Sequence, residues 1–108
     1  MSSYKSIVII PTYNEAENIY KIITALQELD LNILIVDDNS PDGTSNIVRE
    51  MMNSNDKIEI INRKNKLGLG SAYREGFKYS INNGYKYLIQ MDADFSHRIE
   101  DLEKLLDL

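Results

Sequence analysis

The chain has 108 residues, of which 43% are hydrophobic and 27% are charged, and these values fit one compact domain with its own core. It contains no cysteine and one histidine, which excludes disulfide frameworks, thiolate metal sites and histidine-rich metal clusters. Any bound metal must therefore be held by oxygen. Seventeen acidic against twelve basic residues give a net charge of −5, which argues against nucleic acid as a partner, because nucleic-acid-binding domains concentrate positive charge.

The first residues contain neither the apolar core of a signal peptide nor a run of about 18 apolar residues that could span a membrane. We therefore expect a cytoplasmic chain, or one bound peripherally at the cytosolic face of a membrane.

The first half of the chain predicts two strand–helix units. An apolar, β-branched run at residues 6–10 predicts the first strand. Residues 15–29 repeat Ile and Leu at helical spacing after Asn14, a favoured N-cap residue, and so predict the first helix. A second strand at 31–36 and a second helix at 44–52 follow on the same grounds.

The second half repeats this pattern. Residues 57–61 predict the third strand, 71–82 a third helix that ends at Asn83-Gly84, and 87–91 the fourth strand. A fourth helix, from about Ile99 to the last residue, carries an apolar stripe that needs a surface to pack against.

Alternation of strands and helices is typical of parallel β-α-β units, so we expect an α/β fold with a doubly wound, mostly parallel sheet. The expected strand order is 3-2-1-4, and the continuous apolar character of the strands indicates helices on both faces. In such a sheet ligands bind beyond the C-terminal strand ends, near the switch point between strands 1 and 4.

Polar segments follow three of the strands at this edge: residues 11–15 (PTYNE), 37–44 (DDNSPDGT) and 92–97 (DADFSH). Turn chemistry alone explains much of this composition, above all at 39–43. The first turn has no glycine, which excludes the loop of a dinucleotide-binding fold. The pair Gly68 and Gly70 lacks the rest of either standard phosphate-binding motif, and a loop before a helix explains it equally well.

Asp92 and Asp94 stand two residues apart at a strand end, so their carboxylates leave the chain on the same side. Mg²⁺ and Mn²⁺ are usually held by one or two carboxylates, with waters and substrate phosphate oxygens completing the shell. The pair therefore predicts a site for a divalent cation and phosphate. Tyr13 can present its ring to a base, whereas Glu15 can equally favour a helix N-terminus and His97 can equally be a solvated loop residue.

Four segments in this order, VIIPTYNEAENI, VDDNSPDGT, KLGLGSAYREGFKYS and MDADFSH, closely resemble family 2 glycosyltransferases of the GT-A fold. The likeness runs from about residue 7 to residue 97 and is strongest to the dolichol/polyprenol-phosphate mannosyltransferases of that family. Four ordered motifs are far more specific than a lone Asp-x-Asp.

The resemblance implies roles for the residues at the strand ends. The nucleoside of a sugar-diphosphate donor would lie among Pro11, Tyr13, Glu15, Val36 and Asp38. The metal and the diphosphate would lie at Asp92, Ala93 and Asp94, with Asp92 and Asp94 as the catalytic carboxylates. Ser96 falls where some relatives have a further metal ligand.

The activity that the resemblance implies is inverting transfer of a hexose, with mannose from GDP-mannose as the expected donor, to a polyprenyl or dolichyl phosphate. Mg²⁺ or Mn²⁺ would stabilise the leaving diphosphate, and the acceptor phosphate is ionised at neutral pH, so it needs no general base. Family members continue well beyond the Asp-x-Asp motif. We therefore expect residues 1–108 to be the donor-binding part of one GT-A domain, incomplete for catalysis alone, which self-associates through the edge of the fourth strand.

Two alternatives come from other classes of protein. Residues 33–39 (ILIVDDN) also resemble the start of a response-regulator receiver with Asp92 as the phosphoacceptor, but the later strands of a receiver have no counterpart after Asp92. A non-catalytic nucleotide-binding or interaction module is the second alternative. Neither the donor base nor the sugar is determined by the residues themselves.

Overall fold

The computed structural model describes residues 5–64 and 68–93 of the chain. Strands and helices alternate along it, and the elements are β1 (Ser6–Thr12), α1 (Ala16–Gln27), β2 (Asn32–Asp37), α2 (Thr44–Met52), β3 (Ile58–Asn62), α3 (Leu69–Asn82) and β4 (Tyr87–Gln90). None of the helices within these ranges is long and apolar enough to cross a membrane.

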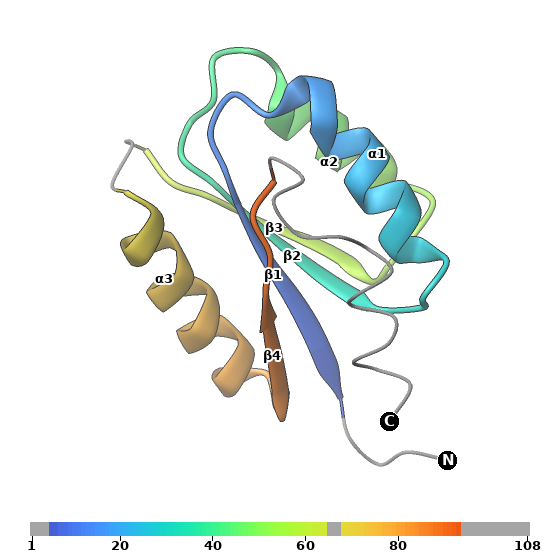
Figure 1. The fold of residues 1–108 in the computed structure, drawn as a ribbon, viewed down its shortest axis with the longest axis vertical. Helices are drawn as coiled ribbons and strands as arrows, with labels where there is room; N and C mark the ends of the chain where they lie inside the picture. The colour runs from blue at the N-terminus through green and yellow to red at the C-terminus, as the bar shows by residue number, and fades with distance from the viewer. Residues whose placement is uncertain (1–4, 65–67, 94–108) are drawn as a thin grey trace.

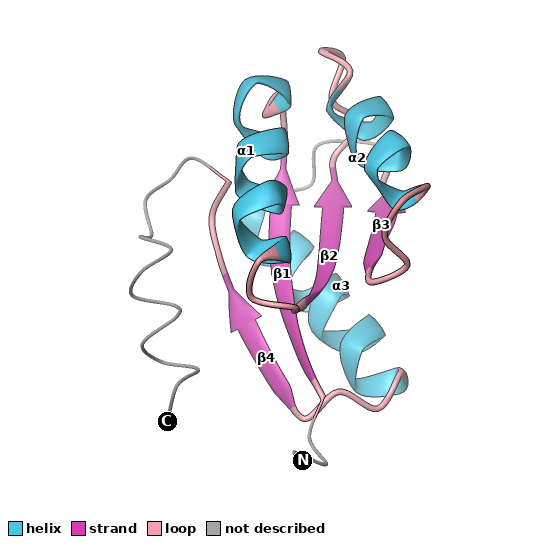
Figure 2. Ribbon diagram, turned by 90° about the vertical axis from the view of Figure 1, so that its right-hand side faces the viewer, coloured by secondary structure: helices cyan, strands magenta, loops and turns pink. Residues whose placement is uncertain are grey.

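The four strands form one parallel sheet in the order β3-β2-β1-β4. Helices α1 and α2 cover one face of the sheet and α3 covers the other (Figures 1 and 2). The doubly wound topology and the strand order predicted from the sequence are thus confirmed. The order places β1 at the switch point, because the connections on its two sides run over opposite faces.

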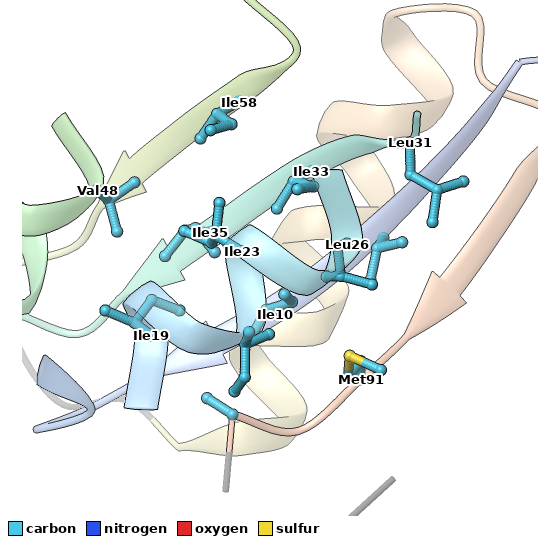
Figure 3. Packing of buried hydrophobic residues seen from close by; sticks show 13 residues of the cluster. Ile10, Ile19, Ile23, Leu26, Leu31, Ile33, Ile35, Val48, Ile58 and Met91 are labelled. Atoms are coloured by element: carbon cyan, nitrogen blue, oxygen red, sulfur yellow. The ribbon is translucent and has the colours of Figure 1, made fainter. Parts of the chain in front are cut away.

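Two apolar clusters lie on the two faces of the sheet because successive side chains of each strand point to opposite sides. The cluster under α1 and α2 (Figure 3) has as fully buried members Val8, Ile10, Ile19, Ile22, Ile23, Leu26, Ile33, Ile35, Val48 and Ile58. The cluster under α3 contains Ile7, Ile9, Leu34, Val36 and Ala72, with Tyr73 and Phe77 partly buried against it. At about 1.5–3 kcal/mol for each fully buried side chain, these clusters are the main source of stability.

Helix α3 approaches β1 closely at Gly76. A Cβ atom built on Gly76 would lie 2.5 Å from Cγ2 of Ile9, a distance that real Cβ atoms do not show. The absence of a side chain therefore sets how near α3, which carries part of the site, lies to the sheet.

Among the helices described, α1 and α3 differ from their predicted bounds. Helix α1 ends at Gln27 instead of residue 29, and Asp30 takes a left-handed backbone conformation at φ 57°. Helix α3 begins at Leu69, two residues earlier than predicted, whereas α2 has the predicted bounds. Near the end of α3, the side chain of Ile81 is 66% exposed.

The strands also differ from their predicted form. Strand β1 continues through Pro11 to Thr12 because Thr12 pairs with Asp37 at the end of β2. The edge strands β3 and β4 are only partly buried, so the expectation of cover on both faces holds for β1 and β2 alone. The predicted fourth helix lies outside the described residues, and self-association through β4 stays a prediction.

Candidate functional site

A cavity of about 230 Å³ lies at the C-terminal edge of the sheet. Its walls come from the end of β1, from the segments that follow β1, β2 and β4, and from the start of α3. The lining residues are Pro11, Thr12, Tyr13, Glu15, Asp38, Gly68, Leu69, Ala72, Asp92 and Ala93. This is the place where a doubly wound sheet binds its ligands.

The structure brings most of the residues singled out from the sequence together in this cavity. Six of them line it, namely Pro11, Tyr13, Glu15, Asp38, Asp92 and Ala93. Val36 is not among the lining residues, because its side chain is fully buried in the cluster under α3. Asp94, Ser96 and His97 lie outside the described residues.

The two consecutive aspartates at the end of β2 have different surroundings. Asp37 is fully buried and accepts hydrogen bonds from the Thr12 hydroxyl at 2.5 Å and from the Ser40 hydroxyl and amide at 2.7 and 2.9 Å. It therefore joins the ends of β1 and β2. Asp38 instead lies at the cavity, on the side of β3.

Arg63, which directly follows β3, holds Asp38 in place. Its Nε and Nη2 donate to the two carboxylate oxygens of Asp38 at 2.5 and 2.9 Å. Its Nη1 donates to the hydroxyl of Ser71 at 2.8 Å and its Nη2 also to the carbonyl of Gly68 at 3.2 Å. The hydrogen bond to Asp38 raises the pKa of the Arg63 guanidinium, so the group is a permanent cation.

Sequence reasoning missed Arg63. One signal was available, because Arg63 is a cation placed directly after the third strand, at the edge where acidic residues follow the other strands. Its partner Asp38 is 25 residues away, however, and only the β2–β3 pairing brings the two together.

The N-terminus of α1 is capped by another loop. The amides of residues 14, 15 and 16 donate in turn to the side chains of Ser40 at 2.8 Å, Thr44 at 3.0 Å and Asp42 at 3.0 Å. The prediction of Asn14 as N-cap is therefore wrong. Asn14 takes a left-handed conformation at φ 57°, and the N-cap position belongs to Glu15, whose side chain makes no capping hydrogen bond.

This capping has an electrostatic consequence for the site. Burial opposes ionisation of Asp42, but the hydrogen bonds from Thr44 and from the Ala16 amide outweigh it and lower the pKa of Asp42 below its ordinary value of 3.8. Many nucleotide-binding folds hold phosphate on the free amides at a helix N-terminus. Here three successive amides are already occupied by side chains, so these amides do not hold a phosphate group.

Asp92, the residue expected to hold a cation, lines the cavity directly after β4. Its Oδ1 accepts a hydrogen bond from the hydroxyl of Tyr73 on α3 at 2.7 Å. Among the residues that the structure describes, no three His, Cys, Asp or Glu side chains form a metal-binding group. A carboxylate beside an open cavity still fits Mg²⁺ or Mn²⁺, since these ions take one or two carboxylates and complete their shell with substrate phosphate oxygens.

Comparison with known protein families gives one match over most of the chain. A family model described as "Glycosyl transferase family 2" matches residues 7–108. A "Polyprenol monophosphomannose synthase" of Mycolicibacterium smegmatis is 43% identical over 106 residues, which cover 95% of this chain and 40% of that protein. An "Undecaprenyl-phosphate mannosyltransferase" of Micrococcus luteus is 39% identical over 103 residues, which cover 94% of this chain and 42% of that protein.

Among solved structures, the mannosyltransferase PcManGT from Pyrobaculum calidifontis, in complex with GDP-Man and Mn²⁺, has the same fold. The TM-score is 0.70 at 24% sequence identity, and the match covers 85% of this chain and 28% of that one. The chain thus spans about two fifths of the curated relatives and less than a third of this structural neighbour.

Proposed function

The chain belongs to glycosyl transferase family 2, and from this membership and the cavity we propose that it forms the donor-binding part of a hexosyltransferase. The donor is a sugar linked to a nucleoside diphosphate, and the acceptor is the phosphate of a polyprenyl lipid. The relatives named as acting on polyprenol and undecaprenyl phosphates support this acceptor.

One observation carries the proposal: a single cavity is lined by an aromatic ring, by an anchored carboxylate after β2 and by another carboxylate after β4. The ring of Tyr13, which is 37% exposed, would stack on the base. Asp38, fixed by Arg63, would accept hydrogen bonds from N–H groups of the base. Asp92, together with Asp94, would hold the cation at the diphosphate.

The proposed reaction is a displacement at the anomeric carbon. An oxygen of the lipid phosphate forms a bond to that carbon as the bond from the carbon to the diphosphate oxygen breaks, and the electron pair leaves on the nucleoside diphosphate with inversion. A bound Mg²⁺ or Mn²⁺ supplies charge neutralisation at the leaving diphosphate. Because a lipid phosphate is largely ionised at neutral pH, the chain's own residues bind and orient the donor and need not remove a proton.

For the donor we infer GDP-mannose. The words mannose and mannosyl in the names of the two relatives support the sugar, and the GDP-Man and Mn²⁺ bound to the structural neighbour support the base and the metal. UDP and glucose are the alternatives that a binding experiment distinguishes.

Calorimetric titration tests the proposal with GDP, UDP, GDP-mannose and UDP-glucose, each in Mn²⁺ and in excess EDTA. We expect the guanine nucleotides to bind more tightly than the uracil nucleotides, and only with the metal. Asp92→Asn should abolish the metal-dependent binding without lowering the melting temperature, whereas Asp56→Asn, at an exposed turn, should change neither. Equal affinity in EDTA would remove the metal role from Asp92.

Metal-dependent nucleotide binding without any sugar transfer to polyprenyl phosphate would favour a non-catalytic nucleotide-binding module. Transfer of labelled mannose to the lipid phosphate would establish the transferase. Covalent phosphate on Asp92 after exposure to a small phosphodonor would instead support a response-regulator receiver.

A further inference from the structure

Tyr73 connects helix α3 to the segment after β4. Its hydroxyl donates to Oδ1 of Asp92 at 2.7 Å, across 19 residues of sequence. In the sequence Tyr73 stands where a third glycine would complete a dinucleotide-binding motif. The structure shows a hydroxyl on the carboxylate that lines the cavity.

The position of this hydroxyl is set by packing of the ring. The ring of Tyr73 is partly buried against the cluster under α3 and stacks on Phe77, with centroids 6.2 Å apart and an angle of 26° between the planes. Because a tyrosine side chain has only two rotatable bonds before its hydroxyl, a ring held in this way presents the O–H group at a fixed place. The Tyr73 hydroxyl, which donates the hydrogen bond, is thus in position before any ligand binds.

Helix α3 also contacts the opposite wall of the cavity. Near its first turn, the Gly68 carbonyl and the Ser71 hydroxyl accept hydrogen bonds from Arg63, which in turn holds Asp38. Through Arg63 and Tyr73, the carboxylates of Asp38 and Asp92 are both held against the same helix.

We propose that Tyr73 is a positioning residue for Asp92, and this proposal rests on the proposed function. By donating to Oδ1, Tyr73 fixes the carboxylate in the orientation in which it meets the cation and the diphosphate of the donor. A hydrogen bond to a charged carboxylate is stronger than one between neutral groups, so it restricts the rotation of Asp92 effectively. Removing a hydrogen-bond partner that orients a metal-binding side chain typically lowers metal affinity by about 10- to 100-fold.

Tyr73→Phe tests this with the smallest possible change, because it removes the hydroxyl and keeps the stacked ring. The measurement is titration of Mn²⁺ in the presence of saturating GDP, followed by loss of the free-ion electron paramagnetic resonance signal. We expect the apparent Mn²⁺ affinity to fall by about tenfold, with an unchanged melting temperature. Tyr79→Phe is the matched control, since Tyr79 lies on the same helix and packs against the same cluster, and it should leave Mn²⁺ affinity unchanged.

Each outcome decides the proposal. If Tyr73→Phe binds Mn²⁺ with the same affinity as the unaltered protein, the positioning role is overturned and the proposed function is not affected. An equal loss in Tyr79→Phe, or a loss that follows a lowered melting temperature, shows a packing effect and overturns it as well. Failure of the unaltered protein to bind Mn²⁺ with GDP overturns the proposed function and the role of Tyr73 together.

Discussion

The guanidinium of Arg63 and the carboxylate of Asp38 form a bidentate ion pair. Both side chains are buried, with 4% of the Arg63 surface and 7% of the Asp38 surface exposed. Each partner needs the other, since an ionised group buried without a partner is very costly. The pair also forms one wall of the cavity, so its geometry affects both the stability of the protein and its ligand.

Arg63→Met leaves the Asp38 carboxylate buried without its counterion, and we expect it to lower the free energy of unfolding by about 3–5 kcal/mol. Urea denaturation measures this loss. Lys57→Met is the control: the Lys57–Asp30 pair is also 2.5 Å long but 86% exposed at Asp30, and its loss should cost no more than about 1 kcal/mol.

The double variant Asp38→Leu/Arg63→Met separates stability from binding. Replacing both charges by apolar groups should recover most of the stability lost in the single variant, whereas nucleotide binding should be lost because the Asp38 carboxylate is removed. Equal losses of stability in Arg63→Met and Lys57→Met would show that the buried ion pair contributes no more to stability than the exposed one.

Asp42→Asn should lower the melting temperature at neutral pH. The pKa of Asp42 is depressed in the folded state, so its contribution to stability is present above the unfolded value of 3.8 and is lost as the pH falls through the folded pKa. Melting curves of both proteins should therefore differ most near pH 7 and converge in acid. A difference that stays constant down to the acid limit would contradict the role of the charge, and Asp56→Asn should show no difference at either pH.

Gly76→Ala should destabilise the protein although alanine favours helices. The new methyl group would lie 2.5 Å from Cγ2 of Ile9, and that β-branched side chain on a packed strand has little freedom to turn away. Overpacking of this kind costs about 1–3 kcal/mol, against a helix gain of roughly 1 kcal/mol.

Gly70→Ala on the same helix provides the control for Gly76→Ala. The atom nearest to its new Cβ is the Arg74 guanidinium at 3.6 Å, an ordinary contact, so stability should be unchanged or higher. Urea denaturation of both variants makes the comparison, and equal stabilities would contradict the close packing of α3 on β1.

Tyr79 and Tyr85 should titrate late in alkali. Burial raises the pKa of Tyr79 and Tyr85 above 10.0, and the charge of Glu59 raises both further. Their contribution to stability is present below pH 10 and is lost as the pH rises through the folded pKa values. Glu59→Gln should bring the late phenolate absorbance to lower pH, whereas Glu50→Gln on the exposed side of α2 should not.

The sheet and its order could be predicted because they depend on short-range pattern and on chain handedness. The apolar runs give the strands, and right-handed crossovers leave few orders for four parallel strands. The predicted bounds of α2 agree with the observed Thr44–Met52 for the same reason, since the helical periodicity of its sequence is local.

The parts that could not be predicted depend on contacts between distant residues. Asn14 has the chemistry of an N-cap, but the caps of α1 come from a loop 26 to 29 residues further on. The hydrogen bond from Tyr73 to Asp92 and the ion pair of Arg63 with Asp38 require α3 and β3 to be in place first. The residues nearest the cavity were recognisable from the sequence, but the groups that hold them were not.

The capping of α1 by a distant loop has a consequence for how the protein folds. Helix α1 has 12 residues, a length at which an isolated helix is marginal in water, and its first turn has no side-chain cap of its own. During synthesis the start of α1 should therefore remain frayed until residues 40–44 have left the ribosome and β2 has paired with β1. The cavity wall that contains Tyr13 and Glu15 would then be completed late, by the segment that arrives after it.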